Sequence, residues 1–137
     1  MAKDLQKLLT IDDDDDLRMI GALILETQGG FAVDSFGSGQ AALDHLDGLD
    51  EGSLPDLILL DVMMPHMDGP DTLQKIRTLP SETKRDIPVI FLTAKCQPDE
   101  IVRLVELGAI GVIPKPFDAM TLSQEVRDLW QNHLQKS

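Results

Sequence analysis

Carboxylates stand at two points in this chain where a short apolar run ends. Residues 8–11, apolar apart from one threonine, lead into five consecutive aspartates at 12–16, and the unbroken apolar run 57–60 ends on Asp61. Short apolar runs of this kind are typical of parallel strands that are buried on both faces. The carboxyl ends of such strands lie at one edge of an open α/β sheet, where ligands bind. We therefore expect Asp61 to be presented at this edge rather than buried, with Asp12 and Asp13 beside it.

Two later strand patterns end on Thr93 and Lys115, which would add a hydroxyl and an ammonium to the same edge. Carboxylates that converge raise one another's pKa unless a cation neutralises them. Mg²⁺ suits this role, because it is commonly held by one or two carboxylates, water and phosphate oxygens. A carboxylate can attack phosphorus to give an acyl phosphate, while a metal ion and an ammonium offset the charge on the transferred oxygens. Asp61 is thus the predicted nucleophile, and Lys115 is predicted to hold the phosphoryl oxygens.

Strand patterns alternate with helical patterns along the whole chain. The predicted strands are 8–11, 31–35, 57–61, 87–92 and 109–113, and a helical spacing of apolar residues follows each of them. The polar stretch 80–86 predicts a surface loop. Strict alternation of strand and helix predicts an α/β fold with a doubly wound, five-stranded parallel sheet, right-handed crossovers and helices on both faces.

Composition limits the classes of partner. Twelve basic against 24 acidic residues give a net charge of −12, which disfavours direct binding to nucleic acid or to an anionic membrane surface. A single cysteine, Cys96, forms no internal disulfide, and no apolar stretch has the length of a membrane span or a signal peptide. We expect a cytoplasmic protein with a single domain over residues 1–137 and a core at about 7–134.

Four short motifs follow the predicted strands in order. They are Ile11-Asp12-Asp13, Asp61-x-x-Met64-Pro65-x-Met67-Asp68-Gly69, Leu92-Thr93-Ala94 and Lys115-Pro116-Phe117. Through these motifs the sequence resembles the receiver domain of bacterial two-component response regulators, in its stand-alone form. The resemblance implies a flavodoxin-like receiver fold and a phosphorylation-dependent signalling switch of a two-component phosphorelay. Such a switch is no enzyme beyond its own phosphorylation and slow dephosphorylation.

The resemblance also implies a role for each matching position. Asp61 would accept the phosphoryl group from a sensor histidine kinase or a histidine phosphotransfer protein, and the chain would then contact a downstream protein target. Mg²⁺ would bind Asp61, Asp13 and the main-chain carbonyl of Met63 directly, and Asp12 mostly through water.

Positions after the last two strands would bind the phosphoryl group. The resemblance implies that Thr93, with Ala94 beside it, and Lys115 contact the phosphoryl oxygens, and that the Lys115-Pro116 peptide bond is cis. One position departs from the family pattern: Val112 stands where receivers carry tyrosine or phenylalanine, so coupling through an aromatic rotamer is not expected. By analogy the readout surface lies on the last two helices and the strand between them, with exposed candidates Arg103, Glu106, Arg127 and Trp130. For Trp130 a place in the core is an equal alternative.

Several features have plainer interpretations. Asp14 to Asp16 are expected to cap and solvate the helix that follows them, and the side chains of Met63, Met64 and Met67 are expected to pack. The three histidines show no ligand-like spacing.

Two alternatives to a stand-alone switch stay open. One is a receiver fragment of a larger regulator or hybrid kinase. The other is a metal-dependent aspartyl-phosphate phosphatase, although Met63 stands where such enzymes need a general acid and the chain has no room for a cap domain.

Overall fold

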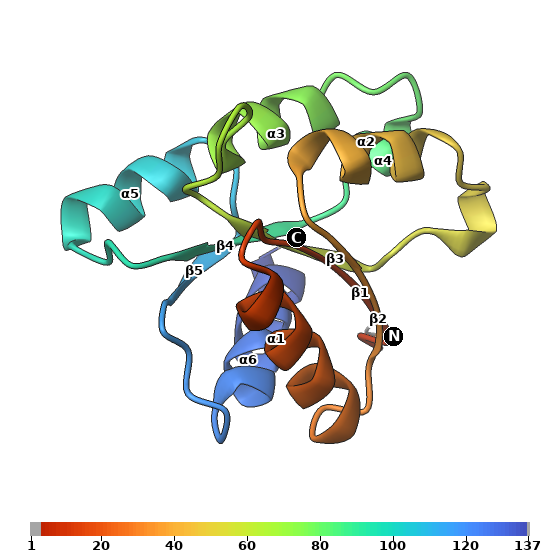
Figure 1. Ribbon diagram of the computed structural model, residues 1–137. Coiled ribbons are helices and arrows are strands. Elements are labelled where there is room, and N and C mark those ends of the chain that lie inside the picture. The colour runs from red at the N-terminus through yellow and green to blue at the C-terminus, as the bar shows by residue number, and fades with distance from the viewer. Residues whose placement is uncertain (1–3, 137) are drawn as a thin grey trace.

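The computed structural model describes residues 4–136 and contains one parallel sheet of five strands (Figure 1). The strands are β1 (Lys7–Ile11), β2 (Ala32–Phe36), β3 (Leu57–Asp61), β4 (Val89–Thr93) and β5 (Gly111–Pro114). Their order across the sheet is β2-β1-β3-β4-β5. This order places β3 at the centre, with β1 and β4 on either side. The predicted doubly wound five-stranded fold is confirmed.

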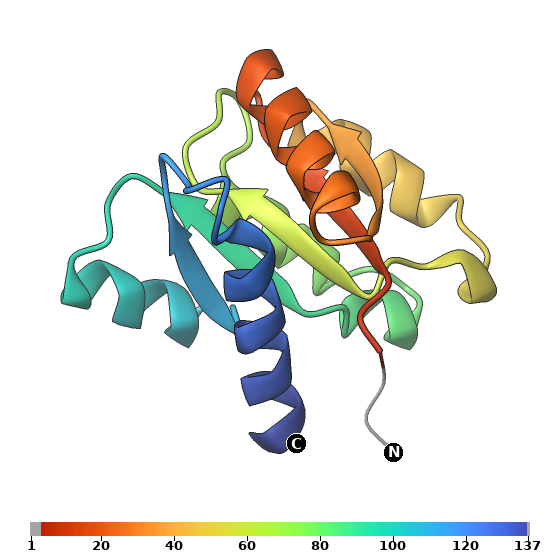
Figure 2. The same ribbon diagram turned by 90° about the horizontal axis from the view of Figure 1, so that it is seen from below.

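Helices cover both faces of the sheet. They are α1 (Asp15–Thr27), α2 (Gly39–Asp47), α3 (Gly69–Ile76), α4 (Glu82–Arg85), α5 (Pro98–Glu106) and α6 (Leu122–Lys136), with a 3-10 turn η1 (Glu51–Ser53). Helices α1 and α6 lie on one face, where they pack against each other (Figure 2), and the others lie on the opposite face. Among the described residues no helix is long and apolar enough to cross a bilayer.

Short α4 occupies the stretch 80–86 that the sequence predicted as a loop. The Ser81 hydroxyl accepts a hydrogen bond from the Lys84 amide at 3.4 Å and so caps this single turn. The Lys84 ammonium donates to the main-chain carbonyl of Asp47 at 3.0 Å. This contact is made with a residue far away in the sequence, which is why local composition did not indicate a helix here.

Strand β3 supplies apolar side chains to both layers of the core. Its five residues are all buried. Ile58 and Leu60 pack on the side of α2, α3 and α5, whereas Leu57 and Leu59 pack on the side of α1 and α6. A central parallel strand needs apolar residues on both faces because helices cover both. The core therefore fixes the position of Asp61 at the end of β3.

Two of the four expected readout residues are not exposed. Trp130 is only 4% exposed and packs in the α1 and α6 layer. Arg127 is half-buried, with its guanidinium 4.3 Å from the centre of the Phe31 ring and a hydrogen bond to the Gly29 carbonyl. The helical spacing of α6 places both residues toward the core. Arg103 and Glu106 on α5 are exposed, as expected.

The N-terminus of α2 offers a test of local stability. The Ser38 hydroxyl accepts a hydrogen bond from the Ala41 amide at 3.1 Å. We expect Ser38→Ala to lower the free energy of unfolding by about 1 kcal/mol, because this amide loses its partner. Urea unfolding measures the change, and Ser53→Ala is the matched control because Ser53 contributes its main-chain carbonyl, not its hydroxyl, to a hydrogen bond. Equal losses in both variants would contradict the capping role.

Candidate functional site

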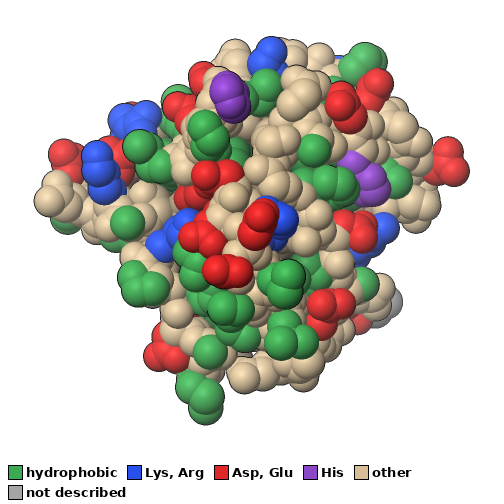
Figure 3. All heavy atoms as spheres, in the orientation of Figure 1, with side chains coloured by type: hydrophobic (Ala, Val, Ile, Leu, Met, Phe, Trp, Pro, Cys, Tyr) green, Lys and Arg blue, Asp and Glu red, His purple; other side chains and the backbone are tan. Residues whose placement is uncertain are grey.

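Three carboxylates meet at the carboxyl edge of the sheet. Strand β1 pairs with β3 in a register that places Ile11 beside Leu60, so the residues that follow, Asp12 and Asp61, are also neighbours. Asp13 comes next in the loop after β1. One carboxylate oxygen from each of Asp12, Asp13 and Asp61 lies within 4.8 Å of the other two. The predicted convergence of these aspartates is found in the structure, and Figure 3 shows acidic side chains grouped at the centre of this face.

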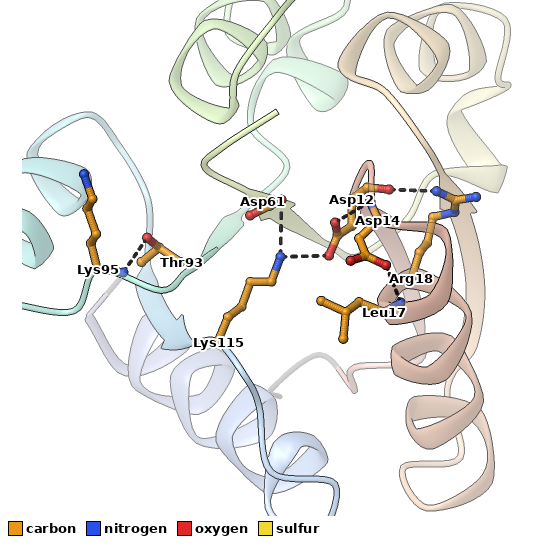
Figure 4. A network of polar contacts seen from close by, with 8 residues as sticks. All are labelled: Asp12, Asp14, Leu17, Arg18, Asp61, Thr93, Lys95 and Lys115. Carbon is orange, nitrogen blue, oxygen red and sulfur yellow. Dashed lines mark hydrogen bonds and ion pairs between the residues drawn. The ribbon is translucent and has the colours of Figure 1, made fainter. Parts of the chain in front are cut away.

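Lys115 joins two of these carboxylates. Its ammonium Nζ lies 3.2 Å from Asp12 Oδ2 and 3.3 Å from Asp61 Oδ2 (Figure 4). The lysine follows β5, and its amide donates to the carbonyl of Thr93 on the adjacent strand β4 at 2.9 Å. The side chain therefore reaches past the end of β4 to the centre of the sheet. The Lys115-Pro116 peptide bond is cis.

Asp61 is buried, contrary to the expectation that it is presented to solvent. Only 4% of the residue is exposed, because Asp12 and Lys115 lie against it at the strand ends. Burial and the nearby charge of Asp12 raise the pKa of Asp61 to about 6, although Lys115 acts in the opposite direction. Burial alone would lower the pKa of Lys115, but the carboxylates of Asp61 and Asp12 outweigh it and raise that pKa. The site is thus short of positive charge.

The loop after β1 holds Asp12 at several atoms. Its Oδ1 accepts from the Asp14 amide at 3.0 Å, and its main-chain carbonyl accepts from Arg18 Nη1 at 2.8 Å. The Asp14 carboxylate accepts from the Leu17 amide at 3.0 Å, so the predicted helix cap is present. Arg18 could not be identified from the sequence, because an arginine three residues after Asp15 indicates only an ion pair on the helix surface.

The loop after β3 needs glycine at position 69. A Cβ atom there would lie 2.5 Å from the Asp61 carbonyl oxygen and 2.9 Å from the Val62 Cα, both of which belong to the backbone. The Gly69 amide donates to the Val62 carbonyl at 2.9 Å, and Asp68 caps α3 through the Asp71 amide. The Asp-Gly pair of the motif therefore closes the loop tightly behind Asp61.

The methionines of this loop differ in their surroundings. Met64 is 9% exposed and Met67 is half-buried, and both pack against the core, as expected. Met63 is 67% exposed, so the expectation that its side chain packs is wrong. It lies two residues after Asp61, where the chain has left the sheet, between the buried residues Val62 and Met64.

Thr93 ends β4 beside the carboxylates. The residue is 2% exposed, and its hydroxyl accepts a hydrogen bond from the Lys95 amide at 3.0 Å. Figure 4 shows the Lys95 side chain pointing away from Asp61. Ala94 between them is exposed, and Val112 on β5 is partly buried against the α2, α3 and α5 side of the core.

The donor set of the site fits a hard divalent cation. Three carboxylates offer oxygen ligands within 4.8 Å of one another, and Asp13 is exposed while the other two are buried. Oxygen ligands of this kind suit Mg²⁺. A single lysine offsets only part of their charge. A cation near Asp13 and Asp61 would therefore relieve repulsion that the side chains leave in place.

Comparisons of sequence point to one family. The model of the response regulator receiver domain matches residues 8–127. The transcriptional regulatory protein CpxR of Escherichia coli K12 is 39% identical over 123 residues, which are 90% of this chain and 48% of CpxR. Response regulator Rre1 of Synechocystis is 34% identical over 122 residues, 89% of this chain and 50% of Rre1. The chain thus spans about half the length of these curated relatives.

Comparisons of structure agree. The chemotaxis response regulator CheY4 of Vibrio cholerae superposes with a TM-score of 0.79 at 25% identity, over 92% of this chain and 99% of that one. The signal receiver domain of a signal transduction histidine kinase from Syntrophus aciditrophicus gives a TM-score of 0.74 at 31% identity, over 93% and 91% of the two chains. With its sheet order, its acidic cluster and the matched residues 8–127, the chain belongs to the response regulator receiver domain family.

Proposed function

We propose that this chain is a phosphorylation-dependent signalling switch, in which Asp61 accepts a phosphoryl group from a histidine kinase or a histidine phosphotransfer protein. The observation that supports this most directly is the geometry at Asp61. Its carboxylate lies within 4.8 Å of oxygens of Asp12 and Asp13, and 3.3 Å from the ammonium of Lys115. A nucleophile, cation ligands and a charge partner for phosphoryl oxygens are therefore close together.

The chemistry is an in-line displacement at phosphorus. A carboxylate oxygen of Asp61 forms the new O–P bond while the N–P bond of the phosphohistidine breaks, and the electron pair of that bond goes to the imidazole nitrogen. Bound Mg²⁺ supplies positive charge to the transferred oxygens. Asp13, Asp61 and the Met63 carbonyl would hold it, with Asp12 acting through water. Lys115 leaves its pairing with Asp12 to face the phosphoryl group.

Thr93 is the proposed switch. Its hydroxyl oxygen accepts a hydrogen bond from the Lys95 amide, and the same hydroxyl can donate its hydrogen to a phosphoryl oxygen. A movement of Thr93 toward the phosphoryl group therefore carries Lys95 with it and favours a second arrangement of the loop between β4 and α5. Val112 carries no ring that would follow this movement, and we propose that the change is transmitted through the loop to the exposed face of α5, with Arg103 and Glu106.

Exposed apolar side chains beside the site provide a contact surface for the phosphodonor protein. Met19, Ile20 and Leu23 on α1 are 70%, 49% and 59% exposed, and Met120 is 82% exposed. Figure 3 shows hydrophobic side chains adjoining the acidic cluster. A donor histidine has to reach Asp61 from this side, because the sheet and the core cover the other sides.

The chain covers only about half the length of its curated relatives. This supports a second form of the same proposal, in which the receiver acts within a larger regulator. The phosphatase alternative is not favoured, because Met63 is an exposed thioether that cannot donate a proton to a leaving group. A single domain over 1–137 and a cytoplasmic location stay predictions.

Incubation with acetyl phosphate or phosphoramidate and Mg²⁺, followed by intact mass measurement, tests the proposed function. We expect one added phosphoryl group, which is lost slowly and is absent without Mg²⁺. Asp61→Asn should gain none, and Asp13→Asn should react more slowly at limiting Mg²⁺ because a cation ligand is lost. Rapid turnover of a small phosphate ester would instead identify a phosphatase, and an unchanged mass of the wild type would refute the proposal.

A further inference from the structure

Arg18 occupies an unusual position for a charged residue on the first turns of α1. Its guanidinium turns back over the start of the helix, where Nη1 donates to the Asp12 carbonyl at 2.8 Å (Figure 4). Nη2 donates to the Asp15 carboxylate, also at 2.8 Å. Its side chain is only 21% exposed. A Cβ atom at Gly37 would lie 3.0 Å from Nη1, so the turn between β2 and α2 packs against the same group. The glycine at position 37 leaves room for the guanidinium.

The carbonyl of Asp12 belongs to the peptide group that leads into Asp13. The other polar atoms of Asp12 are held as well: its amide donates to the Phe36 carbonyl, Oδ1 accepts from the Asp14 amide, and Oδ2 faces Lys115. Asp13 itself is exposed. The direction of the Asp13 side chain therefore depends on the peptide group between Asp12 and Asp13, which Arg18 holds through the Asp12 carbonyl.

We infer that Arg18 is a positioning residue for the cation site: by holding the Asp12 carbonyl it aims the Asp13 carboxylate at Asp61. This inference rests on the proposed function. Groups that orient metal ligands without touching the metal typically change metal affinity by about 10- to 100-fold when they are removed. Arg18 fits this role because its planar guanidinium holds its N–H donors in a fixed arrangement toward both acceptors, whereas the donors of an ammonium rotate.

The charge of Arg18 and its positioning role have opposite effects on Mg²⁺ affinity. A positive charge near the site repels Mg²⁺, so removal of the charge alone would strengthen binding. Loss of positioning weakens it. The sign of the change in Mg²⁺ affinity therefore separates the geometric role from the charge.

The experiment compares Mg²⁺ dissociation constants, measured by calorimetric titration, for the wild type, Arg18→Met and Asp15→Asn. We expect Arg18→Met to weaken binding about tenfold, and Arg18→Lys to recover part of that loss through a single hydrogen bond to the carbonyl. Asp15→Asn is the matched control, because it weakens only the Nη2 contact; its affinity should stay within about twofold. Thermal unfolding of each variant confirms that it is folded.

A second measurement needs no metal. Without the Arg18 contact the loop loosens, so hydrogen exchange of the Asp14 amide should accelerate in Arg18→Met and not in Asp15→Asn. Equal or tighter Mg²⁺ binding in Arg18→Met would overturn the positioning role while the proposed function stood. Failure of the wild type to bind Mg²⁺ would refute the proposed function instead, and an unchanged Asp14 exchange rate would then overturn the role of Arg18.

Discussion

Lys115→Met is expected to lower the free energy of unfolding by about 2–3 kcal/mol at about pH 8 without Mg²⁺. The ammonium lies 3.2 Å and 3.3 Å from carboxylate oxygens of Asp12 and Asp61, which are 3% and 4% exposed. Without it two buried carboxylates face each other with no compensating cation. One of them then either takes up a proton or stays charged against desolvation and repulsion, and either outcome raises the free energy of the folded state. Urea unfolding in the presence of a chelator measures the change.

Two conditions should reduce this loss. At about pH 5 Asp61, whose pKa is about 6, is largely neutral in the folded protein, so less charge is left unpaired. Saturating Mg²⁺ should also restore part of the stability, because a ligand that binds only the folded state stabilises it. Lys95→Met is the matched control: this exposed lysine lies near the site, and its loss should change stability by no more than about 0.5 kcal/mol. A loss that is the same at both pH values would show that the stem of Lys115 matters, not its charge.

Asp61→Asn is expected to stabilise the protein by about 1–3 kcal/mol at about pH 8. The pKa of Asp61 is about 6 in the folded protein against an ordinary value of 3.8. Between these values the folded state holds a proton that the unfolded chain has released, so the stability of the wild type falls as pH rises through this range. Asparagine carries no such penalty. The difference between variant and wild type should therefore be largest above the folded pKa and disappear below the unfolded one.

Urea unfolding of both proteins between about pH 5 and pH 8, with a chelator present, measures this difference. We expect the advantage of Asp61→Asn at pH 5 to be about half of that at pH 8. Asp13→Asn serves as the control, because Asp13 is exposed and its removal relieves less repulsion. A destabilised Asp61→Asn at pH 8 would show that the hydrogen bonds and ion pair of Asp61 outweigh its burial. A stabilised variant that accepts no phosphoryl group would show that stability is given up for reactivity at this position.

Most of the fold could be predicted from the sequence by itself. The apolar run 57–60 with no polar face predicted a central strand, and the structure places β3 at the middle of the sheet with all five residues buried. This inference succeeds because a strand that is buried on both faces has apolar residues at consecutive positions. Alternation of strand and helix restricts the connections to right-handed crossovers, so the parallel sheet followed as well.

The helix α4 and the burial of Trp130 were not predicted, because both depend on contacts with residues that are distant in the sequence. The Ser81 cap and the contact of Lys84 with the Asp47 carbonyl stabilise a helix of a single turn, which has too few residues to show a period. Trp130 on α6 is buried because of where this helix lies on the sheet. An apolar residue on a helix is compatible with either side until that packing is known.

For the site, the sequence determined which side chains reach the edge of the sheet, because each of Asp12, Asp61, Thr93 and Lys115 follows or ends a strand and parallel strands end together. Only the tertiary structure decided their environment. The register of β1 with β3 and the reach of Lys115 bury Asp61 and raise its pKa, and neither is encoded in local spacing. The contact of Arg18 with the Asp12 carbonyl likewise appears only when helix and loop are folded together, because its acceptor is a backbone atom that no residue type identifies.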